Sequence, residues 1–222
     1  PENAPTALPA AMKQFRAEGL DIPLVTTPGD FTDPTAAYAE PLWAACAEAG
    51  VRLVKLGYWY MGPDGYWATV DRVRKALEGF ARLAEKYGPK ACVHTHSGST
   101  MGLNASSVMN LVRGFDPRHI GVFADPGHLS IVGEPLPMAL SILGEYLSIL
   151  AFKDLVRERV VREGKPGWQT KVVPLGTGFV DWTTLLRLLG EIGYDGPISF
   201  HSEYSGYPVD TVVDLARIDI RF

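Results

Sequence analysis

Cysteine, clustered positive charge and long apolar runs are all scarce in this chain, and each shortage excludes a class of protein. Only two of the 222 residues are cysteines, Cys46 and Cys92, and neither belongs to a CxxC pair. A disulfide framework is therefore excluded, and we expect both thiols in the core of a protein from a reducing compartment or of a disulfide-free fold. No apolar run approaches the roughly 20 residues that a membrane helix needs.

Positive charge is neither abundant nor concentrated in one stretch. The chain has 21 lysines and arginines against 25 acidic residues, which gives a formal net charge of -4. Nucleic acids and anionic membranes are bound by clustered positive charge, so we expect neither as a partner. A small polyhydroxylated molecule is the expected partner, and a homodimer is left open.

The two ends of the chain lack the usual terminal signals. The first ten residues, PENAPTALPA, contain no initiator Met and no signal-peptide pattern, and the last seven, ARIDIRF, resemble the middle of a helix. We therefore expect that material is missing at both ends. A cytoplasmic protein is the expectation, with a removed targeting segment left open.

What the chain does contain is a regular alternation of helical and β-rich stretches. Amphipathic spacing predicts helices over Thr6–Glu18, Thr35–Ala49, Ala68–Tyr87, Leu103–Arg113, Pro137–Tyr146, Trp182–Ile192 and from Val209 onward. Short β-branched runs predict strands near Ile22–Thr26, Arg52–Gly57, Ala91–His96, Ile120–Asp125, Leu147–Lys153 and Pro197–Glu203. Such alternation indicates a parallel sheet, either doubly wound or closed into a barrel.

The position of the polar residues distinguishes these two folds. The GxGxxG and P-loop patterns of doubly wound nucleotide-binding proteins are absent. Ionisable residues instead follow the C-terminal ends of several strands, as they do in the active site of a (β/α)8 barrel. We predict a (β/α)8 TIM barrel whose first two strands are missing from this chain.

Side-chain alternation along the strands supports a common site. If the ionisable residues of five strands point to the barrel axis, their apolar neighbours, such as Val54, Val122 and Phe152, point outward to the helices. This phase brings a set of polar groups to one mouth of the barrel: Lys55, His94, His96, Asp125, Lys153, His201 and Glu203, with His128 from the following loop. Groups of this kind must form pairs, shift their pKa values or hold a metal when they share a buried space.

Three other features have more than one interpretation. Asp154 is expected to face outward or lie in a loop, as part of a surface ion pair. The loop PLGTG is expected to form a turn before a helix capped by Asp181, with a phosphate-binding loop as the weaker alternative. The aromatic run YWYMGPDGYW, which includes Trp59, is interpreted as a stacking wall for a sugar ring or as a helix-packing lid.

Four segments in order resemble a known family. FADPGHLSIVG is similar to a "D-x-G-H" motif, LAFKD to "H-x-K-D", PLGTGFVDW to "P-L-G-x-G-x-V-D-W", and GYDGPISFHSEY to the final strand of the xylose isomerase-like sugar phosphate isomerase/epimerase family. The resemblance extends from about Val51 to Tyr204. It implies one TIM-barrel domain over residues 1–222, incomplete at both termini.

The same resemblance implies a divalent metal site that has changed in this chain. Many family members bind one ion through Glu, Asp, His and Glu from four strands, and Asp125 matches the aspartate. His94 stands where the first glutamate is expected, Ala151 replaces the histidine, and His201 lies where the last glutamate often lies. We expect a replacement set of His94, Asp125 and His201, to which His96 or Glu203 could add, holding Mn, Zn, Mg or Fe.

The expected activity is that of a sugar or sugar-phosphate isomerase or epimerase. Glu203, with Lys153 or His94 on the opposite side, would move a proton next to a carbonyl. The substrate would be held by His128, matching the family's substrate-binding histidine, with His96, Lys55 and Trp59. The alternatives are an enzyme without a metal, in which Lys153 and Lys55 supply the positive charge, and a carbohydrate-binding barrel without activity.

Overall fold

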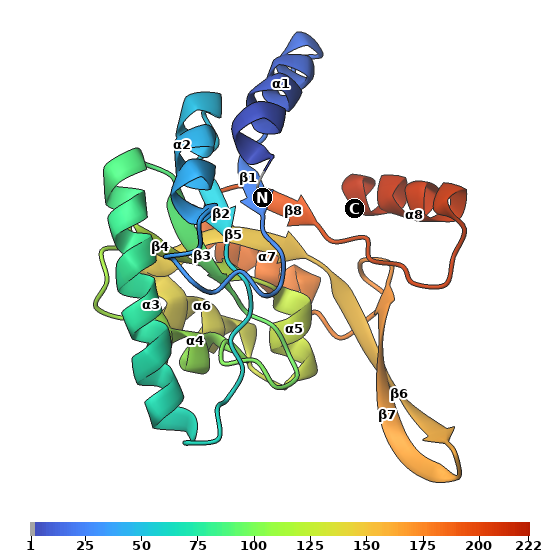
Figure 1. Cartoon of the computed structure of the whole chain (residues 1–222). Helices are drawn as coiled ribbons and strands as arrows, with labels where there is room; N and C mark the ends of the chain where they lie inside the picture. Colours follow the sequence, from blue (N-terminus) through green and yellow to red (C-terminus); the bar gives the residue numbers. More distant parts are fainter. Residues whose placement is uncertain (1–2) are drawn as a thin grey trace.

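A curved parallel sheet forms the centre of the molecule. The structure is a computed structural model and describes residues 3–222. Within these residues six parallel strands form one sheet in the order β1-β2-β3-β4-β5-β8, with helices packed on its outer face (Figure 1). The strands are β1 (Leu24–Thr26), β2 (Leu53–Lys55), β3 (Lys90–His94), β4 (Ile120–Ala124), β5 (Leu147–Phe152) and β8 (Ile198–Phe200).

The helices connect successive strands, as the predicted alternation requires. They are α1 (Ala4–Ala17), α2 (Ala39–Ala49), α3 (Tyr66–Tyr87), α4 (Ala105–Val112), α5 (Pro126–Ile131), α6 (Leu136–Leu143), the 3-10 turn η1 (Gly144–Tyr146), α7 (Trp182–Glu191) and α8 (Val209–Arg221). No helix among the described residues is long and apolar enough to cross a membrane. Each predicted helix has a counterpart here, and the short helix α5 is an addition.

Local sequence explains where several of these helices begin and end. Asn104 and Ser107 form a capping box at the start of α4, which satisfies two backbone N–H groups that the helix leaves free. Gly50 ends α2 in the left-handed conformation, at φ 78°, which a glycine adopts without steric cost. On α3 the buried side chains follow helical spacing, with Val70, Val73 and Leu77 all on the face toward the sheet.

The predicted phase of the strands is confirmed by two separate hydrophobic clusters. The outward residues Val54, Val93, Val122 and Leu150 belong to the main core between the sheet and the helices. The alternate residues form a small cluster on the inner face: Leu53, Cys92, Phe123, Ile149 and Ala151. On β8, by contrast, the outward residues Ile198 and Phe200 remain about 40% exposed, at 42% and 39%.

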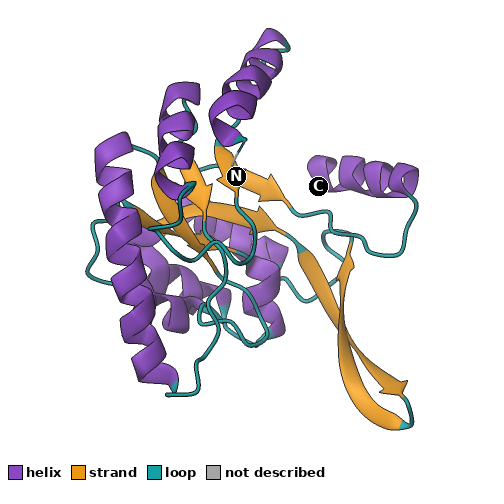
Figure 2. Cartoon of the chain, viewed as in Figure 1, coloured by secondary structure: helices purple, strands orange, loops and turns teal. Residues whose placement is uncertain are grey.

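A long β-hairpin is the largest departure from the expected elements, since no strand was predicted between Lys153 and the helix that begins at Trp182. Strands β6 (Asp154–Arg162) and β7 (Lys165–Val173) pair with each other and project from the body as a two-stranded ribbon (Figure 2). The turn between them places Glu163 at φ 52° and Gly164 at φ 75°. Two consecutive residues at positive φ are typical of the tight turns that join antiparallel strands.

Candidate metal centre and barrel mouth

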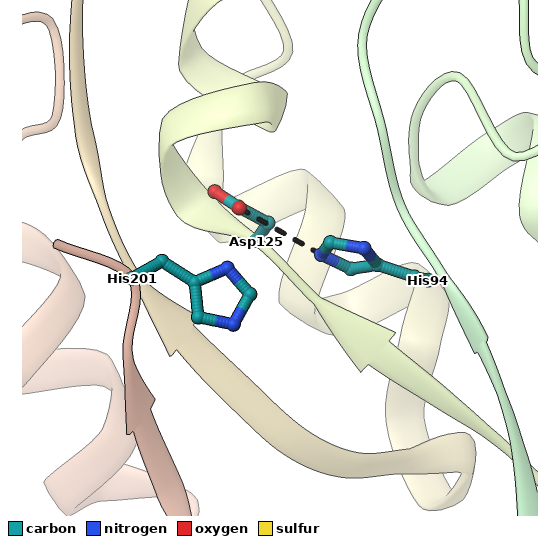
Figure 3. Close-up of side chains that lie close together, drawn as sticks. All are labelled: His94, Asp125 and His201. Atoms are coloured by element: carbon teal, nitrogen blue, oxygen red, sulfur yellow. Dashed lines mark ion pairs between the residues drawn. The ribbon is translucent and has the colours of Figure 1, made fainter. Parts of the chain in front are cut away.

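Three side chains from three strands converge at one end of the sheet. His94 is the last residue of β3, Asp125 directly follows β4, and His201 directly follows β8. One potential ligand atom from each lies within 4.8 Å of the others, and the three side chains point toward a common space (Figure 3). The strand ends therefore bring together the three residues expected to replace the usual ligand set.

The hydrogen bonding of these residues is consistent with a cation site. His94 Nε2, Asp125 Oδ2 and His201 Nδ1 are buried atoms that have no hydrogen-bond partner. Buried polar atoms without partners are rare because each costs free energy, so three that face one space need an explanation. Two imidazoles and a carboxylate are suitable ligands for zinc, iron or manganese, so the residues present fit a divalent ion.

Asp125 is fixed by its backbone surroundings so that only one oxygen faces the site. Its backbone N–H donates to Thr95 Oγ1 at 2.8 Å, and its Oδ1 accepts the backbone N–H of His128 at 3.0 Å, which caps α5. Burial alone would raise the pKa of Asp125, but His94, His128 and Lys153 together outweigh burial and hold that pKa well below its ordinary value. The carboxylate is therefore ionised, and Oδ2 presents a negative charge to the site.

Lys153 supplies a positive charge inside the same pocket. Its Nζ lies 3.0 Å from Glu203 Oε2, 3.5 Å from Asp125 Oδ2 and 3.3 Å from His128 Nε2, and the side chain is 3% exposed. The lysine thus links the carboxylate at the bottom of the site to the carboxylate at its rim. Glu203 itself remains 60% exposed and can reach a ligand in the mouth.

The contact with Lys153 also determines the tautomer of His128. An ammonium group only donates, so His128 Nε2 accepts and the ring proton sits on Nδ1, which donates to Ser97 Oγ at 2.8 Å. Burial is the main cause that lowers the pKa of His128 to about 3, so the ring is neutral near pH 7. The hydroxyl proton of Ser97 is then free to donate to a ligand.

His96 lies beside His128, although β3 ends two residues before it. The two rings have centroids 3.9 Å apart, and His96 Nδ1 lies 2.7 Å from the carbonyl oxygen of Ser97. Burial lowers the pKa of His96. The sequence prediction that His94 and His96 belong to one mouth is consistent with this arrangement, but His96 contacts the neighbouring cavity and is not part of the convergent set.

Lys55 and Tyr58 form the opposite wall. Lys55 is 5% exposed, and its Nζ lies 4.0 Å from the centroid of the Tyr58 ring. Burial lowers the pKa of Lys55 to about 8. The Tyr58 hydroxyl lies 2.9 Å from His94 Nδ1, and burial raises the pKa of Tyr58, so the hydroxyl stays protonated.

Tyr58 is a site residue that the sequence interpretation missed. The aromatic run was noticed, but Trp59 was chosen as the residue that contacts a ligand. The Trp59 ring is half-buried against the main core, whereas the Tyr58 ring packs edge-on to His96 with centroids 5.0 Å apart. Strand alternation would have placed Tyr58, three residues beyond Lys55, on the opposite face, and the irregular segment after β2 returns its ring to the site.

The expectation that Asp154 is a surface residue was wrong. Asp154 is fully buried, and its two oxygens accept hydrogen bonds from the indole of Trp182 and from four backbone N–H groups: Leu155, Gly176, Gly178 and Val180. The carboxylate therefore holds the PLGTG loop against the end of β5. Because this carboxylate already uses three N–H groups of the loop and its continuation, the loop does not offer them to a phosphate.

The turn interpretation of the same loop is confirmed. Asp181 caps α7, and its side chain accepts the backbone N–H of Thr184 at 3.0 Å. Ala151, at the position of the usual histidine ligand, is fully buried among the apolar residues of the inner face. Alanine has no donor atom, so among residues 3–222 the convergent set consists of His94, Asp125 and His201.

A cavity of about 560 Å³ lies beside His96 and His128, which are neighbours of the convergent residues His94 and Asp125. It is lined by the loop after β3, by α5 and by the base of the hairpin: His96, Ser97, Gly98, His128, Ile131, Val132, Arg157 and Thr170. This volume suits a small organic molecule. The hairpin was not predicted from the sequence, yet it contributes one wall of the cavity through the cross-strand pair Arg157 and Thr170.

Known proteins resemble this chain over its whole described length. The model of the xylose isomerase-like TIM barrel family matches residues 3–222. The solved structure of a D-tagatose 3-epimerase-like protein superposes with a TM-score of 0.75 at 19% sequence identity, over 98% of this chain and 82% of that one. The barrel fold predicted from the strand-end position of the polar residues is thus confirmed.

Curated relatives match a shorter stretch. An uncharacterised protein of Methanocaldococcus jannaschii is 24% identical over 136 residues, which are 60% of this chain and 44% of that protein. An inosose dehydratase of Bacillus velezensis is 29% identical over 141 residues, 60% of this chain and 47% of the enzyme. The chain therefore spans about half the length of the curated relatives it matches.

Proposed function

The chain belongs to the xylose isomerase-like TIM barrel family, and on that premise we propose that it is a carbohydrate isomerase or epimerase. It moves a proton next to the carbonyl of a small polyhydroxylated substrate with the help of a divalent cation. One observation carries the proposal: three buried ligand atoms that form no hydrogen bond converge beside a lysine–glutamate pair that can exchange protons with a substrate. Two similar proteins, a D-tagatose 3-epimerase-like protein and an inosose dehydratase, are named for carbohydrate substrates, which supports the substrate class.

The cation would be held by His94, Asp125 and His201. A cation bound there would supply Lewis-acid stabilisation of the carbonyl and of the negative charge that develops when the neighbouring carbon loses its proton. Burial lowers the pKa values of both histidines, that of His94 to about 4, so both rings are neutral and have a lone pair to offer near pH 7. Asp125 contributes the single negative charge.

Glu203 is the base that this arrangement favours. It lies at the mouth, is 60% exposed, and its Oε2 accepts from Lys153 Nζ at 3.0 Å. Lys153 orients the Glu203 carboxylate and, because the two groups are in direct contact, can pass a proton to or from it on the same side of the substrate. In a reaction without a cation, His94 Nε2 has no competing partner and would act as the second acid–base group.

The remaining contacts hold the substrate. His128 and His96 line the 560 Å³ cavity together with Ser97, whose free hydroxyl proton suits a sugar oxygen. Lys55 contributes a positive charge from the opposite wall, and Trp59 remains a proposed outer wall. Arg157 adds a donor from the hairpin, because no hydrogen bond or ion pair engages it among residues 3–222.

The alternative without a metal is favoured by a different observation. Lys153 Nζ already lies 3.5 Å from Asp125 Oδ2, so one positive charge faces the carboxylate without any ion. In that case Lys153 and Lys55 would stabilise the developing charge. Metal affinity distinguishes the two mechanisms directly.

The experiment measures cation binding and proton exchange together. We expect the purified protein to bind one Zn²⁺ or Mn²⁺ per chain by titration calorimetry, and His94→Ala, Asp125→Ala and His201→Ala each to weaken binding by about 100-fold or more. His119→Ala is the control, because it removes an imidazole before β4 that does not belong to the convergent set.

Activity is followed by deuterium uptake. The metal-loaded protein is incubated in deuterated water with ketohexoses and inososes, and mass spectrometry detects exchange at the carbon beside the carbonyl. We expect exchange with at least one substrate and its loss in Glu203→Gln. Two results together would contradict the metal-dependent mechanism: no binding of a divalent cation, and unchanged deuterium exchange in the three ligand variants.

A further inference from the structure

Tyr58 is held so that its hydroxyl has one direction to face. Its backbone N–H donates to the carbonyl oxygen of Gly29 at 2.7 Å, and Gly57 before it donates to the carbonyl oxygen of Phe31 at 2.8 Å. A side chain at Gly57 would meet both of these backbone segments at 2.7 to 2.8 Å, so only glycine permits this approach. The ring is enclosed by Lys55 Nζ at 4.0 Å and by the His96 ring at 5.0 Å.

The Tyr58 hydroxyl contacts the ring nitrogen of His94 that points away from the convergent space. The distance from Oη to His94 Nδ1 is 2.9 Å, while Nε2 faces Asp125 Oδ2 at 3.7 Å and has no partner. His94 is only 3% exposed, so bulk water does not replace this contact. The tautomer of His94, which decides whether Nε2 can bind a cation, therefore depends on the Tyr58 hydroxyl at Nδ1 and on the Asp125 carboxylate near Nε2.

A tyrosine hydroxyl can both donate and accept a hydrogen bond. If Oη donates to Nδ1, the ring proton of neutral His94 sits on Nε2 and faces the carboxylate of Asp125. If Oη accepts from an Nδ1 proton, Nε2 presents its lone pair to the space shared with Asp125 and His201. The two states differ by rotation of one O–H bond and transfer of one ring proton through solvent, with no net proton gained or lost by His94.

We propose that Tyr58 is a positioning residue that lets His94 change between these two tautomers, so that His94 Nδ1 has a hydrogen-bond partner both with and without a bound divalent cation. The inference rests on the proposed function, since it assumes a cation held by His94, Asp125 and His201. A carboxylate or a carbonyl at the position of the hydroxyl would only accept, and would fix the tautomer that binds the cation. The hydroxyl instead keeps Nδ1 hydrogen-bonded in both states.

This role has a structural reason in the change of ligand type. The family resemblance places a glutamate at the position of His94, and a carboxylate has no tautomer to control. An imidazole that takes over as ligand must lose the proton on Nε2 and keep the one on Nδ1, which then needs an acceptor in a buried place. Tyr58 Oη is the atom at hydrogen-bonding distance from that nitrogen.

The test compares Tyr58→Phe with Tyr60→Phe in the full chain. Tyr58→Phe keeps the ring that packs on Lys55 and His96 and removes only the hydroxyl, whereas Tyr60 is 58% exposed and its hydroxyl contacts no site residue among those described. We expect Tyr58→Phe to weaken Zn²⁺ binding by about 10- to 100-fold and Tyr60→Phe to leave it unchanged.

A spectroscopic readout separates positioning from a general loss of structure. Long-range nitrogen–proton NMR of the histidine-labelled protein is expected to show the His94 proton on Nε2 without Zn²⁺ and on Nδ1 with it. In loaded Tyr58→Phe, the Nδ1 proton loses its acceptor and exchanges too fast to be observed. Equal affinity of Tyr58→Phe and wild type, or the same tautomer with and without Zn²⁺, overturns the inference alone. A wild-type protein that binds no Zn²⁺ overturns the proposed metal site and this inference with it.

Discussion

Lys153 Nζ lies 3.5 Å from Asp125 Oδ2, which is also one of the three atoms that face the candidate cation site. The ammonium group and a divalent ion would therefore compete for the same carboxylate. In the absence of an ion, Lys153 is the charge that stabilises buried Asp125. A bound ion would repel Lys153 toward Glu203, whose Oε2 is 3.0 Å away.

Replacing Lys153 should separate these two effects. Lys153→Met leaves Asp125 ionised and without its nearest cation, so we expect the free energy of unfolding of the metal-free protein to fall by about 3 to 5 kcal/mol. Added Zn²⁺ should then raise the melting temperature more in this variant than in wild type, as calorimetry would measure. Lys165→Met, in the exposed part of the hairpin, is the control. A variant that is as stable as wild type, with the same response to Zn²⁺, contradicts the competition.

Asp154 should be a major stabilising residue although it does not face the site. Five donors surround its oxygens, and an amide in place of the carboxylate would direct its own N–H group against one of them. We expect Asp154→Asn to cost about 3 kcal/mol in urea denaturation and to expose residues 174–180 to proteolysis. Asp181→Asn keeps a good helix cap and should change stability by less than about 0.5 kcal/mol. Similar stabilities of the two variants would refute this role.

The two cysteines should resist alkylation as long as the chain is folded. Both are fully buried, and burial raises the pKa of each thiol to about 12. The thiolate is the reactive form, so at pH 8 only about one thiol in 10⁴ is ionised, and the rate should keep rising with pH beyond the usual range near pH 8.5. Iodoacetamide at pH 8 should give no adduct by intact mass, and two adducts after unfolding in urea. Rapid labelling of the folded protein at pH 8 would show that a thiol is accessible.

Stability of the metal-free protein should fall in mild acid. Burial lowers the pKa of His94 to about 4 and that of His128 to about 3, while the same residues titrate near pH 6.5 in the unfolded chain. Between these values the unfolded chain binds more protons than the folded one. The free energy of unfolding therefore decreases as the pH falls below about 6.5, by up to about 1.4 kcal/mol per pH unit for each histidine.

Urea denaturation between about pH 7.5 and about pH 5 measures this slope. His128→Gln keeps an acceptor for Lys153 and a donor for Ser97 but does not titrate, so its slope should be smaller than that of wild type. A stability that does not change over this range would contradict the assignment of neutral histidines.

The parts of the fold that depend on the alternation of side chains along a strand could be predicted from the sequence. An apolar residue that packs under a helix determines that its neighbours in the strand point to the opposite face of the sheet. The phase that sent Val54 and Val122 outward also placed Lys55 and Asp125 inward, and the two hydrophobic clusters confirm the division. The convergence of His94, Asp125 and His201 was expected for the same reason. Their roles as ligands stay a prediction.

The sequence interpretation failed where long-range hydrogen bonds determine whether a side chain is buried and what it contacts. Asp154 next to Lys153 resembles a surface ion pair, and only the return of the chain at Gly176 and Gly178 buries its charge. The hairpin was missed because its strands have little buried apolar surface, and because its turn, Glu163-Gly164, lacks the Asn-Gly or Asp-Gly pair that marks a two-residue hairpin. Tyr58 was passed over because no local pattern indicates which nitrogen of a distant histidine a hydroxyl will meet.

The ribbon formed by β6 and β7 has a consequence for how this barrel can diverge. Its far end, with Val161 and Trp168 more than 60% exposed at 69% and 65%, is remote from the cluster at the strand ends. Only its base, at Arg157 and Thr170, lines the cavity. Changes in the length or the charge of this ribbon would alter the cavity offered to a ligand without moving His94 or Asp125. Chemistry and choice of ligand would then be able to evolve on separate pieces of the polypeptide.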